Sequence, residues 1–287
     1  FHGDFGLTIE ECAPYGTILA ITPTTNPIAT VVNNAISMVA SGNAVVFAPH
    51  PTAQKSSLTT MDLLNEAIES AGGPANLLTA TSEAKIETAQ ALMEHKGINL
   101  IVATGGPAVV DAALRSGKRA IGAAAGNPPA LVDDTADPAK AARDIIAGHS
   151  FDNNMPCTSE KEVIVTAGIA DALFAAFKAM PEVCLLPANL LPQLEKVVLN
   201  EQRTGPNRKY IGQNACVILK ELGITAGEDV RAIVADVRGD HAFVRHELMM
   251  PVLGVVRSGT FEQADAIHGT AGTGDAHNEP ARAALSH

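Results

Sequence analysis

An α/β fold built on parallel β-sheets is predicted by two features of the sequence. Short apolar runs alternate with segments of helical length, and Gly or Pro marks the junctions between them. The composition agrees, because 46% of the 287 residues are hydrophobic, only 3% are aromatic and Trp is absent. The core must therefore be packed from Ala, Val, Ile and Leu, and the 24 glycines favour close packing of helices on a sheet.

The first part of the chain alternates strand and helix from residue 15 to about residue 132. The expected elements, in order, are strand 16–21, helix 27–40, strand 44–47, helix 52–71, strand 77–79, helix 84–94, strand 99–103, helix 107–115 and strand 119–123. Turn residues set the limits of these elements: TPTTNP breaks the first strand, Gly42-Asn43 ends the first helix, and GGP at 72–74 stops the second.

A second set of elements begins near residue 130. A helix is expected at 138–149, a strand at 162–165 and a helix at 170–180, followed by a longer mixed stretch to residue 257. No internal repeat is found. The final segment, which ends in GTAGTGDAHNEPARAALSH, is rich in Gly and Ala with little periodicity, so residues 261–287 are expected to be a loosely ordered tail.

Charge and cysteine content exclude several classes of protein. The formal charge of −11 repels phosphate backbones, so nucleic acid is not an expected partner. No targeting leader and no apolar run of the roughly 20 residues needed to span a bilayer is found, which predicts a cytoplasmic protein. The His residues lack metal-ligand spacing, so no metal is expected. The four Cys form no CxxC pair and are expected to be free thiols.

Two turns at the carboxyl ends of expected strands each allow two interpretations. In TPTTNP at 22–27, Asn26 could offer its amide to a ligand, or it could simply cap the next helix with Pro27 in the first helical position. The cap is favoured on spacing alone. In ATGGP at 103–107, two glycines would allow a phosphate close to a helix N-terminus, although an ordinary tight turn is equally consistent.

The segment FDNNMPC at 151–157 places Cys157 where a loop enters a new strand. Reactive thiols favour such partly exposed sites, which are rich in backbone amides that stabilise a thiolate. An ordinary buried cysteine fits the residues of this segment equally well.

Together these segments resemble the CoA-acylating aldehyde dehydrogenases, of the propionaldehyde and acetaldehyde type found in bacterial microcompartments. The resemblance runs from Gly6 to about Phe261 and is carried by the following segments: ITPTTNPIATVVNNAIS, GNAVVFAPHP, NLIVATGGPAVVDAALRSGKRAIGAAAGNPPALVDDTAD, FDNNMPCTSEKEVIV, PNRKYIGQNA and HELMMPVLGVVR. It implies an aldehyde-dehydrogenase-like fold in which a Rossmann-like parallel-sheet cofactor domain is joined to an α/β catalytic domain. The implied division is the end of an oligomerisation arm at 1–14, a partial cofactor-binding domain at 15–125, a partial catalytic domain at 126–260 and an atypical tail at 261–287.

The resemblance also implies roles for individual residues. Cys157 matches the nucleophile that forms a thiohemiacetal and then a thioester, and the Asn26 side chain with the Cys157 backbone N–H would form the oxyanion hole. Glu247 matches the glutamate that holds the nicotinamide ribose. The remaining implied cofactor-binding residues are Thr24, Ala48, Pro49, His50, Thr104, Gly105 and Gly106. The hydrolytic relatives carry a Lys at the position of Ala48, so the contacts to the adenosine ribose should differ here.

One substitution separates the acylating enzymes from the acid-forming ones. Hydrolytic members carry a Glu as general base in an ELGG-type segment, which here is Ala123-Ala124-Ala125-Gly126, with Ala123 at the position of the base. Without that base the thioester should persist until the thiol of CoA accepts the acyl group. The resemblance therefore implies NAD and CoA, a short aldehyde such as propionaldehyde or acetaldehyde, and reversible ping-pong turnover.

Members of this group are longer than this chain, so segments at both ends are expected to be missing. The full-length protein is expected to be a homo-oligomer, a dimer or a tetramer, in the cytoplasm or inside a microcompartment with its shell as a partner. The alternatives are the aldehyde dehydrogenase half of a bifunctional aldehyde–alcohol dehydrogenase, which FDNNMPC disfavours, and a hydrolytic enzyme, which Ala123 disfavours. A third alternative is an inactive truncated remnant that serves as a binding or assembly module.

Overall fold

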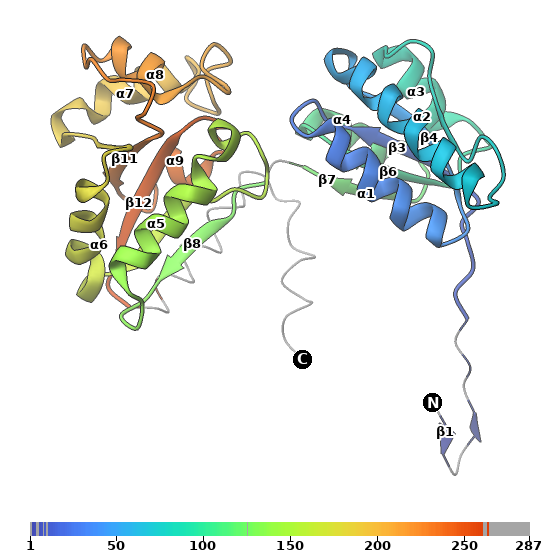
Figure 1. Ribbon diagram of the computed structural model, residues 1–287, viewed down its shortest axis with the longest axis horizontal. Helices are drawn as coiled ribbons and strands as arrows, with labels where there is room; N and C mark the ends of the chain where they lie inside the picture. Colours follow the sequence, from blue (N-terminus) through green and yellow to red (C-terminus); the bar gives the residue numbers. More distant parts are fainter. Residues whose placement is uncertain are drawn as a thin grey trace. The chain divides into compact units, whose positions relative to one another are not determined.

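The computed structural model describes residues 11–124 and 126–260, together with residues 2, 3, 6, 7, 9 and 263. It divides into two compact units, Phe1–Ala125 and Gly126–His287, and each is described by itself (Figure 1). Within the first ten residues, β1 (His2–Gly3) and β2 (Gly6–Leu7) form an antiparallel pair. The expected loosely ordered tail at 261–287 lies outside the described residues except for residue 263.

The first unit is built on a sheet of five parallel strands in the order β5-β4-β3-β6-β7. The strands are β3 (Thr17–Thr22), β4 (Ala44–Pro49), β5 (Leu78–Ala80), β6 (Leu100–Thr104) and β7 (Ala120–Ala123). The first strand of this sheet, β3, lies in its centre, and the chain then adds strands first on one side and later on the other. This order places a topological switch point between β3 and β6, where open α/β sheets bind ligands.

Helices cover both faces of this sheet. They are α1 (Pro27–Ala40), the 3₁₀ turn η1 (Pro51–Ala53), α2 (Gln54–Ser70), α3 (Ile86–Glu94) and α4 (Pro107–Arg115). Alternate strand residues divide between the faces: Ile18 and Phe47 pack against α1 and α2, whereas Leu19 and Ile101 pack against α3 and α4. The sheet is therefore buried on both sides, as a parallel sheet requires.

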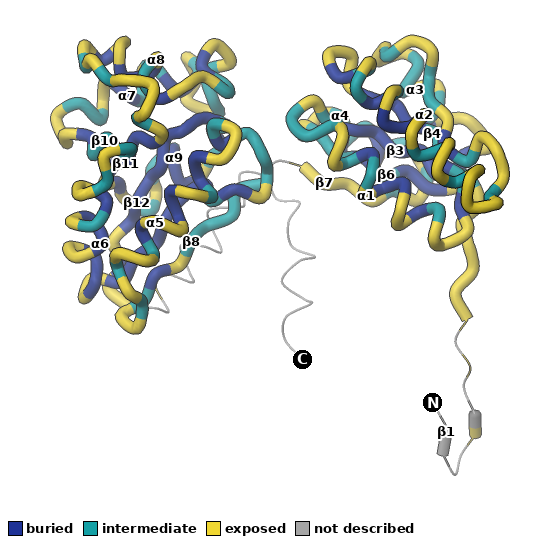
Figure 2. The backbone as a smooth tube through the Cα atoms, in the orientation of Figure 1, coloured by how far each residue is buried: buried dark blue, intermediate teal, exposed yellow. Residues whose placement is uncertain are grey.

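The second unit repeats this architecture with a parallel sheet in the order β10-β11-β12-β9-β8. The strands are β8 (Pro129–Val132), β9 (Glu162–Thr166), β10 (Val183–Leu185), β11 (Ala232–Val237) and β12 (Val252–Ser258). The helices are α5 (Pro138–His149), η2 (Phe151–Asn154), α6 (Ala167–Ala179), η3 (Ala188–Leu190), α7 (Leu191–Val198), α8 (Ala215–Glu221) and α9 (Ala242–Arg245). Helices α5 and α6 pack on one face, and α7, α8 and α9 on the other. Figure 2 shows the central strands buried beneath helices whose outer sides are exposed.

The predicted α/β class with parallel sheets is confirmed, and three helices have the predicted bounds: α1, α4 and α5. Each begins at a proline, whose fixed φ suits the first helical turn. Three other predicted helices had wrong bounds. The helix expected at 52–71 is the 3₁₀ turn η1 followed by α2, the helix expected at 84–94 begins only at Ile86, and the helix expected at 170–180 begins at Ala167. None of the helices in the described part of the chain has the length and apolarity needed to cross a membrane.

Candidate functional site

One edge of the first sheet gathers most of the cofactor-binding residues expected from the sequence. Strands β3, β4 and β6 are parallel neighbours, with Thr22 opposite Pro49 and Ile21 opposite Ala103, so their carboxyl ends meet at one edge. The N-termini of α1 and α4 begin at the same edge, and helix N-termini favour anionic groups. Thr24, His50 and Gly105 follow the three strand ends and therefore lie along this edge.

A hydrogen-bond chain joins the loops that follow β3 and β4. The Thr24 and Thr52 hydroxyls lie 2.7 Å apart, and the Thr52 hydroxyl is 2.8 Å from His50 Nδ1. The Thr52 backbone N–H also donates to His50 Nδ1, at 3.3 Å. Because Nδ1 accepts, the ring proton of neutral His50 is on Nε2, and the His50 residue is exposed. Ala48 and Pro49 are buried, so His50 is the exposed side chain of the expected ribose-binding group 48–50.

The two glycines after β6 are not equivalent. Gly105 donates its N–H to the Ala123 carbonyl at 3.1 Å, and a Cβ there would meet Val109 at 2.9 Å. A Cβ on Gly106 would meet nothing within 4 Å. The space above the N-terminus of α4 is therefore open at Gly106, where Thr104 and the glycines were expected to approach the cofactor.

Asn26 occupies the N-cap position of α1, but its side chain makes no capping hydrogen bond. The capping role that spacing favoured is therefore wrong for the side chain. The amide oxygen of Asn26 instead accepts from the Thr25 hydroxyl at 3.0 Å. The backbone carbonyl of Asn26 accepts from the Thr30 N–H at 3.1 Å, so the helix starts here without the amide. The Asn26 side chain thus takes no part in capping α1.

The loop that carries Cys157 begins in an unusual backbone conformation. Asp152, Asn153 and Asn154 are consecutive residues with φ of 47°, 50° and 64°. Such left-handed conformations are uncommon outside glycine and persist when the surroundings hold them in place. The Asn153 side chain donates to the Gly212 carbonyl at 2.9 Å, which attaches this loop to the loop that precedes α8. Cys157 follows in a half-buried turn closed by the Ser159 N–H and the Pro156 carbonyl at 3.2 Å.

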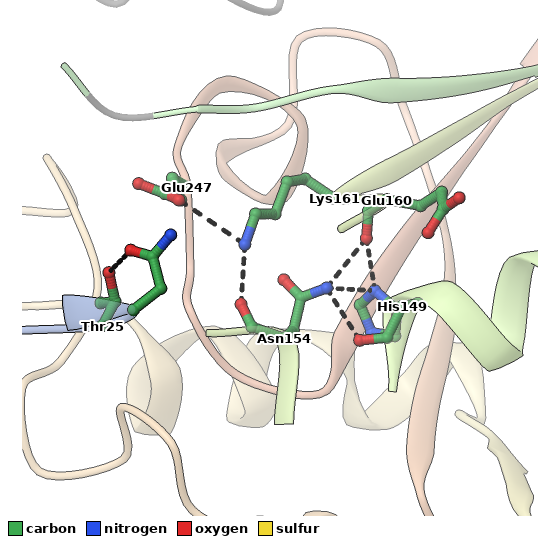
Figure 3. A network of polar contacts seen from close by, with 7 residues as sticks. Thr25, His149, Asn154, Glu160, Lys161 and Glu247 are labelled. Atoms are coloured by element: carbon green, nitrogen blue, oxygen red, sulfur yellow. Dashed lines mark hydrogen bonds and ion pairs between the residues drawn. The ribbon is translucent and has the colours of Figure 1, made fainter. Parts of the chain in front are cut away.

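Hydrogen bonds from Asn154 and His149 hold this loop in place. The His149 Nδ1–H donates to the Glu160 carbonyl at 2.7 Å, since a carbonyl can only accept. The Asn154 amide donates to the carbonyls of His149 and Glu160, both at 2.9 Å. Complete burial lowers the pKa of His149 to about 4, so the ring is neutral at pH 7. Figure 3 shows these groups as one network.

Lys161 lies at the other end of the same loop with a side chain that is only 2% exposed. Its ammonium donates to the Asn154 carbonyl at 2.7 Å and lies 3.6 Å from the Glu247 carboxylate (Figure 3). Burial lowers the pKa of Lys161, and the attraction of Glu247 raises it part of the way back. Burial likewise raises the pKa of Glu247, and Lys161 offsets part of that rise. Each ion therefore reduces the desolvation cost of its partner.

Gly126 connects Cys157 with Glu247. A Cβ at position 126 would lie 2.4 Å from the Cys157 carbonyl oxygen and 2.9 Å from the Cys157 Cβ, so only glycine fits without movement. The Gly126 N–H also donates to the Glu247 carboxylate, which lowers the pKa of that group. The nucleophile candidate, the ribose-binding candidate and the end of the segment 123–126 are thus brought together in the second unit.

Glu162, directly after Lys161, is completely buried at the start of β9. Neither carboxylate oxygen has a hydrogen-bond partner. Burial raises the pKa of Glu162 to about 8, although the positive charge of Lys161 opposes the rise. A protonated carboxyl is the form that such an environment tolerates near pH 7.

The structure thus gathers Thr24, His50, Gly105 and Gly106 along one edge in the first unit, and Cys157 with Glu247 in the second. Asn26 belongs to the first unit, so its partnership with Cys157 in an oxyanion hole stays a prediction. Sequence reasoning missed Lys161, Asn154 and Gly126. Two adjacent charged residues, Lys161 and Glu162, run directly into the apolar strand VIVT, and that pattern was the available signal. No cluster of metal-binding side chains occurs in the part of the chain that the structure describes.

Comparison with known proteins places this geometry in context. Residues 4–186 match the profile of the aldehyde dehydrogenase family. The chain is 46% identical over 269 residues to the acetaldehyde dehydrogenase (acetylating) EutE of Salmonella typhimurium, covering 92% of this chain and 58% of that protein. The chain therefore spans little more than half the length of this curated relative.

Solved structures agree with the sequence comparison. The propionaldehyde dehydrogenase of Rhodopseudomonas palustris, with bound CoA and an acylated cysteine, superposes with a TM-score of 0.81 at 44% identity. That match covers 89% of this chain and 58% of the other. A propionaldehyde dehydrogenase from the Clostridium phytofermentans fucose utilisation bacterial microcompartment gives a TM-score of 0.82 at 44% identity, with the same coverage of 89% and 58%.

Proposed function

The chain belongs to the aldehyde dehydrogenase family, and from that premise we propose that it oxidises a short aliphatic aldehyde to an acyl-CoA with NAD and CoA. The reaction passes through a thioester on Cys157. The relatives named acetylating acetaldehyde dehydrogenase and propionaldehyde dehydrogenase support this substrate class, as does the acylated cysteine of one of them.

The contact between Gly126 and Cys157 carries the proposal. Gly126 ends the segment Ala123–Gly126, whose counterpart in hydrolytic enzymes supplies a Glu as general base. The last residue of this segment, Gly126, touches Cys157, and the segment contains no carboxylate. Without a base to activate water, the thioester survives until the thiol of CoA attacks it.

The proposed chemistry uses a few groups in sequence. The Cys157 thiolate attacks the aldehyde carbon, and the Asn26 amide with the Cys157 N–H holds the resulting oxyanion. Bound NAD would supply the hydride acceptor, and loss of hydride from the C–H bond of this intermediate would leave a thioester on Cys157. The thiolate of CoA then attacks the thioester carbonyl, the bond between the acyl carbon and the Cys157 sulfur breaks, and acyl-CoA leaves with the Cys157 thiolate restored.

The residues present fit a dinucleotide. Thr24, the His50 Nε2–H and the open space at Gly106 line the edge where two helix N-termini favour phosphates. In the second unit, Glu247 presents a carboxylate that is 10% exposed, suited to accept hydrogen bonds from ribose hydroxyls. We assign Thr24, Ala48, Pro49, His50, Thr104, Gly105, Gly106 and Glu247 to cofactor binding on this basis.

We further propose that the full-length protein is a homo-oligomer, a dimer or a tetramer, located in the cytoplasm or inside a bacterial microcompartment. The microcompartment origin of one structural relative supports the second location. Size-exclusion chromatography with light scattering of the full-length protein tests the first point. A measured monomer would contradict it.

The test of the activity is NADH formation from propionaldehyde with and without CoA. The wild-type chain is compared with Cys157→Ala and with Cys216→Ala, a control at another half-buried thiol. Turnover that requires CoA, is lost in Cys157→Ala and persists in Cys216→Ala supports the proposal. CoA-independent turnover would favour a hydrolytic enzyme, and a folded chain that forms no NADH would favour the truncated remnant.

A further inference from the structure

A backbone hydrogen bond holds Lys161 in position independently of its side-chain charge. Its backbone N–H donates to the Pro128 carbonyl at 3.0 Å, which holds the residue at the start of β9. Its side chain is 2% exposed, so the ammonium points into the protein rather than into water. A lysine buried to this degree requires compensation for its lost hydration.

The ammonium closes the loop that carries the thiol. It donates to the Asn154 carbonyl at 2.7 Å, and so joins the two ends of segment 154–161, with Cys157 between them. The Asn154 amide makes a second crossing of the same loop through the Glu160 carbonyl, at 2.9 Å. The position of Cys157 is therefore fixed from both sides.

The charge of Lys161 is incompletely balanced by its described neighbours. The titratable groups around it are Glu247 from the loop before β12, Glu162 from β9, His149 from α5 and Cys157 from the loop itself. His149 is neutral at pH 7, with a pKa of about 4, and the pKa of Glu162 is raised to about 8 by burial. Glu247 is thus the carboxylate that balances Lys161, at 3.6 Å, beyond the length of a strong hydrogen bond. Cys157 is another group within electrostatic reach of the ammonium, and it lies on the loop that the ammonium closes.

We propose that Lys161 is a positioning residue for Cys157, whose buried ammonium clamps the loop and provides the positive charge beside which the thiol ionises. This inference rests on the proposed nucleophilic role of Cys157 and goes beyond it. Glu247 then has two tasks: it holds the nicotinamide ribose, and it moderates the charge of Lys161.

The first test measures the rate of Cys157 alkylation by iodoacetamide against pH, with the modified peptide quantified by mass spectrometry. In Lys161→Met the rate profile should move to higher pH, because the thiolate loses a neighbouring cation and keeps the Glu247 carboxylate. Lys161→Arg keeps the charge and should restore much of the wild-type profile. Lys178→Met, at an exposed position on α6, should leave the profile unchanged.

The second test compares the direction in which the alkylation profile moves along the pH axis in two variants. Glu247→Gln removes the balancing carboxylate and leaves the Lys161 charge, so its profile should move to lower pH, opposite to Lys161→Met. If Lys161 and Glu247 only supported the loop, both variants would disturb it, and their profiles would not move in opposite directions along the pH axis. If Lys161→Met does not fold, the neutral pair Lys161→Met/Glu247→Gln is compared with Glu247→Gln and should react at higher pH.

Coincident profiles for the folded variants, or shifts in the same direction, would overturn the proposal. Alkylation needs no aldehyde, NAD or CoA, so this outcome is independent of the NADH assay. If the two variants show opposite shifts but the chain forms no NADH, the proposal for Lys161 stands and the proposed activity is rejected.

Discussion

Gly126 lies so close to Cys157 that a Cβ at position 126 would come within 2.4 Å of the Cys157 carbonyl oxygen. Since the obstructing atom belongs to the backbone, Gly126→Ala must displace the loop that carries the thiol. We expect NADH formation to fall by about 100-fold, because a displacement near 1 Å at a nucleophile has effects of that size. Overpacking should cost about 1–3 kcal/mol of stability.

The control for this prediction is Gly205→Ala. A Cβ at position 205 would meet one side-chain atom at 3.8 Å, an ordinary contact, so activity and stability should stay near wild type. Steady-state NADH assays and thermal unfolding provide the comparison. Wild-type turnover by Gly126→Ala would show that the close contact does not constrain the position of Cys157.

Asn26→Ala should separate catalysis from stability. The Asn26 side chain makes no capping bond and accepts one hydrogen bond from the Thr25 hydroxyl, so the stability of the fold should change by no more than about 0.5 kcal/mol. If the amide holds the oxyanion, NADH formation should drop by roughly 100- to 1000-fold. Asn33→Ala, on the exposed side of α1, is the matched control and should retain activity. A helix that melts in Asn26→Ala would restore the structural interpretation.

Glu162 makes the second unit less stable at alkaline pH. Its pKa is raised to about 8 from the ordinary value of 4.5, so the folded state holds a proton that the unfolded state has released between these values. Its contribution to stability is therefore fully present below about pH 4.5 and is lost as the pH rises through 8. Glu162→Gln removes the titration, and its stability relative to wild type should rise by roughly 2 kcal/mol or more between pH 5 and pH 8.5.

Urea unfolding at several pH values measures this effect. The chain has two tyrosines, Tyr15 in the first unit and Tyr210 buried in the second, and no Trp. In a Tyr15→Phe background, Tyr210 fluorescence reports the second unit alone. Glu201→Gln, at an exposed position, is the control. A stability difference between Glu162→Gln and wild type that does not vary with pH would refute the raised pKa.

His149 makes the second unit less stable at acid pH, whereas Glu162 does so at alkaline pH. Its pKa is lowered by burial from 6.5 to about 4, so the unfolded state binds a proton that the folded state excludes. Its contribution to stability is present above pH 6.5 and is lost as the pH falls toward 4, with a slope of at most about 1.4 kcal/mol per pH unit. His149→Asn keeps a donor for the Glu160 carbonyl but cannot titrate. The acid sensitivity of the second unit, measured through Tyr210, should therefore become shallower, and an unchanged slope would contradict a buried neutral His149.

Prediction from sequence succeeded where local chemistry decides the structure. The bounds of α1, α4 and α5 were predicted, and each of these helices begins at a proline, whose fixed φ suits the first turn. It failed where packing overrides local preference. Helix α6 begins at Ala167, three residues before the predicted start, because Ile169 and Ala170 are buried against the sheet and the first turn is held there.

The sequence by itself determined the α/β class, the family resemblance and the identity of Cys157, Asn26 and Glu247 as candidates, because these depend on residue types and their order along the chain. Only the tertiary structure decided which groups surround these candidates and which of those groups are buried. The burial of Lys161 between Asn154 and Glu247 joins residues 86 positions apart, from Lys161 to Glu247, and no periodicity reports such a distance. The unpaired carboxyl of Glu162 and the close approach of Gly126 to Cys157 likewise arise from folding, because burial and contact are properties of the folded chain.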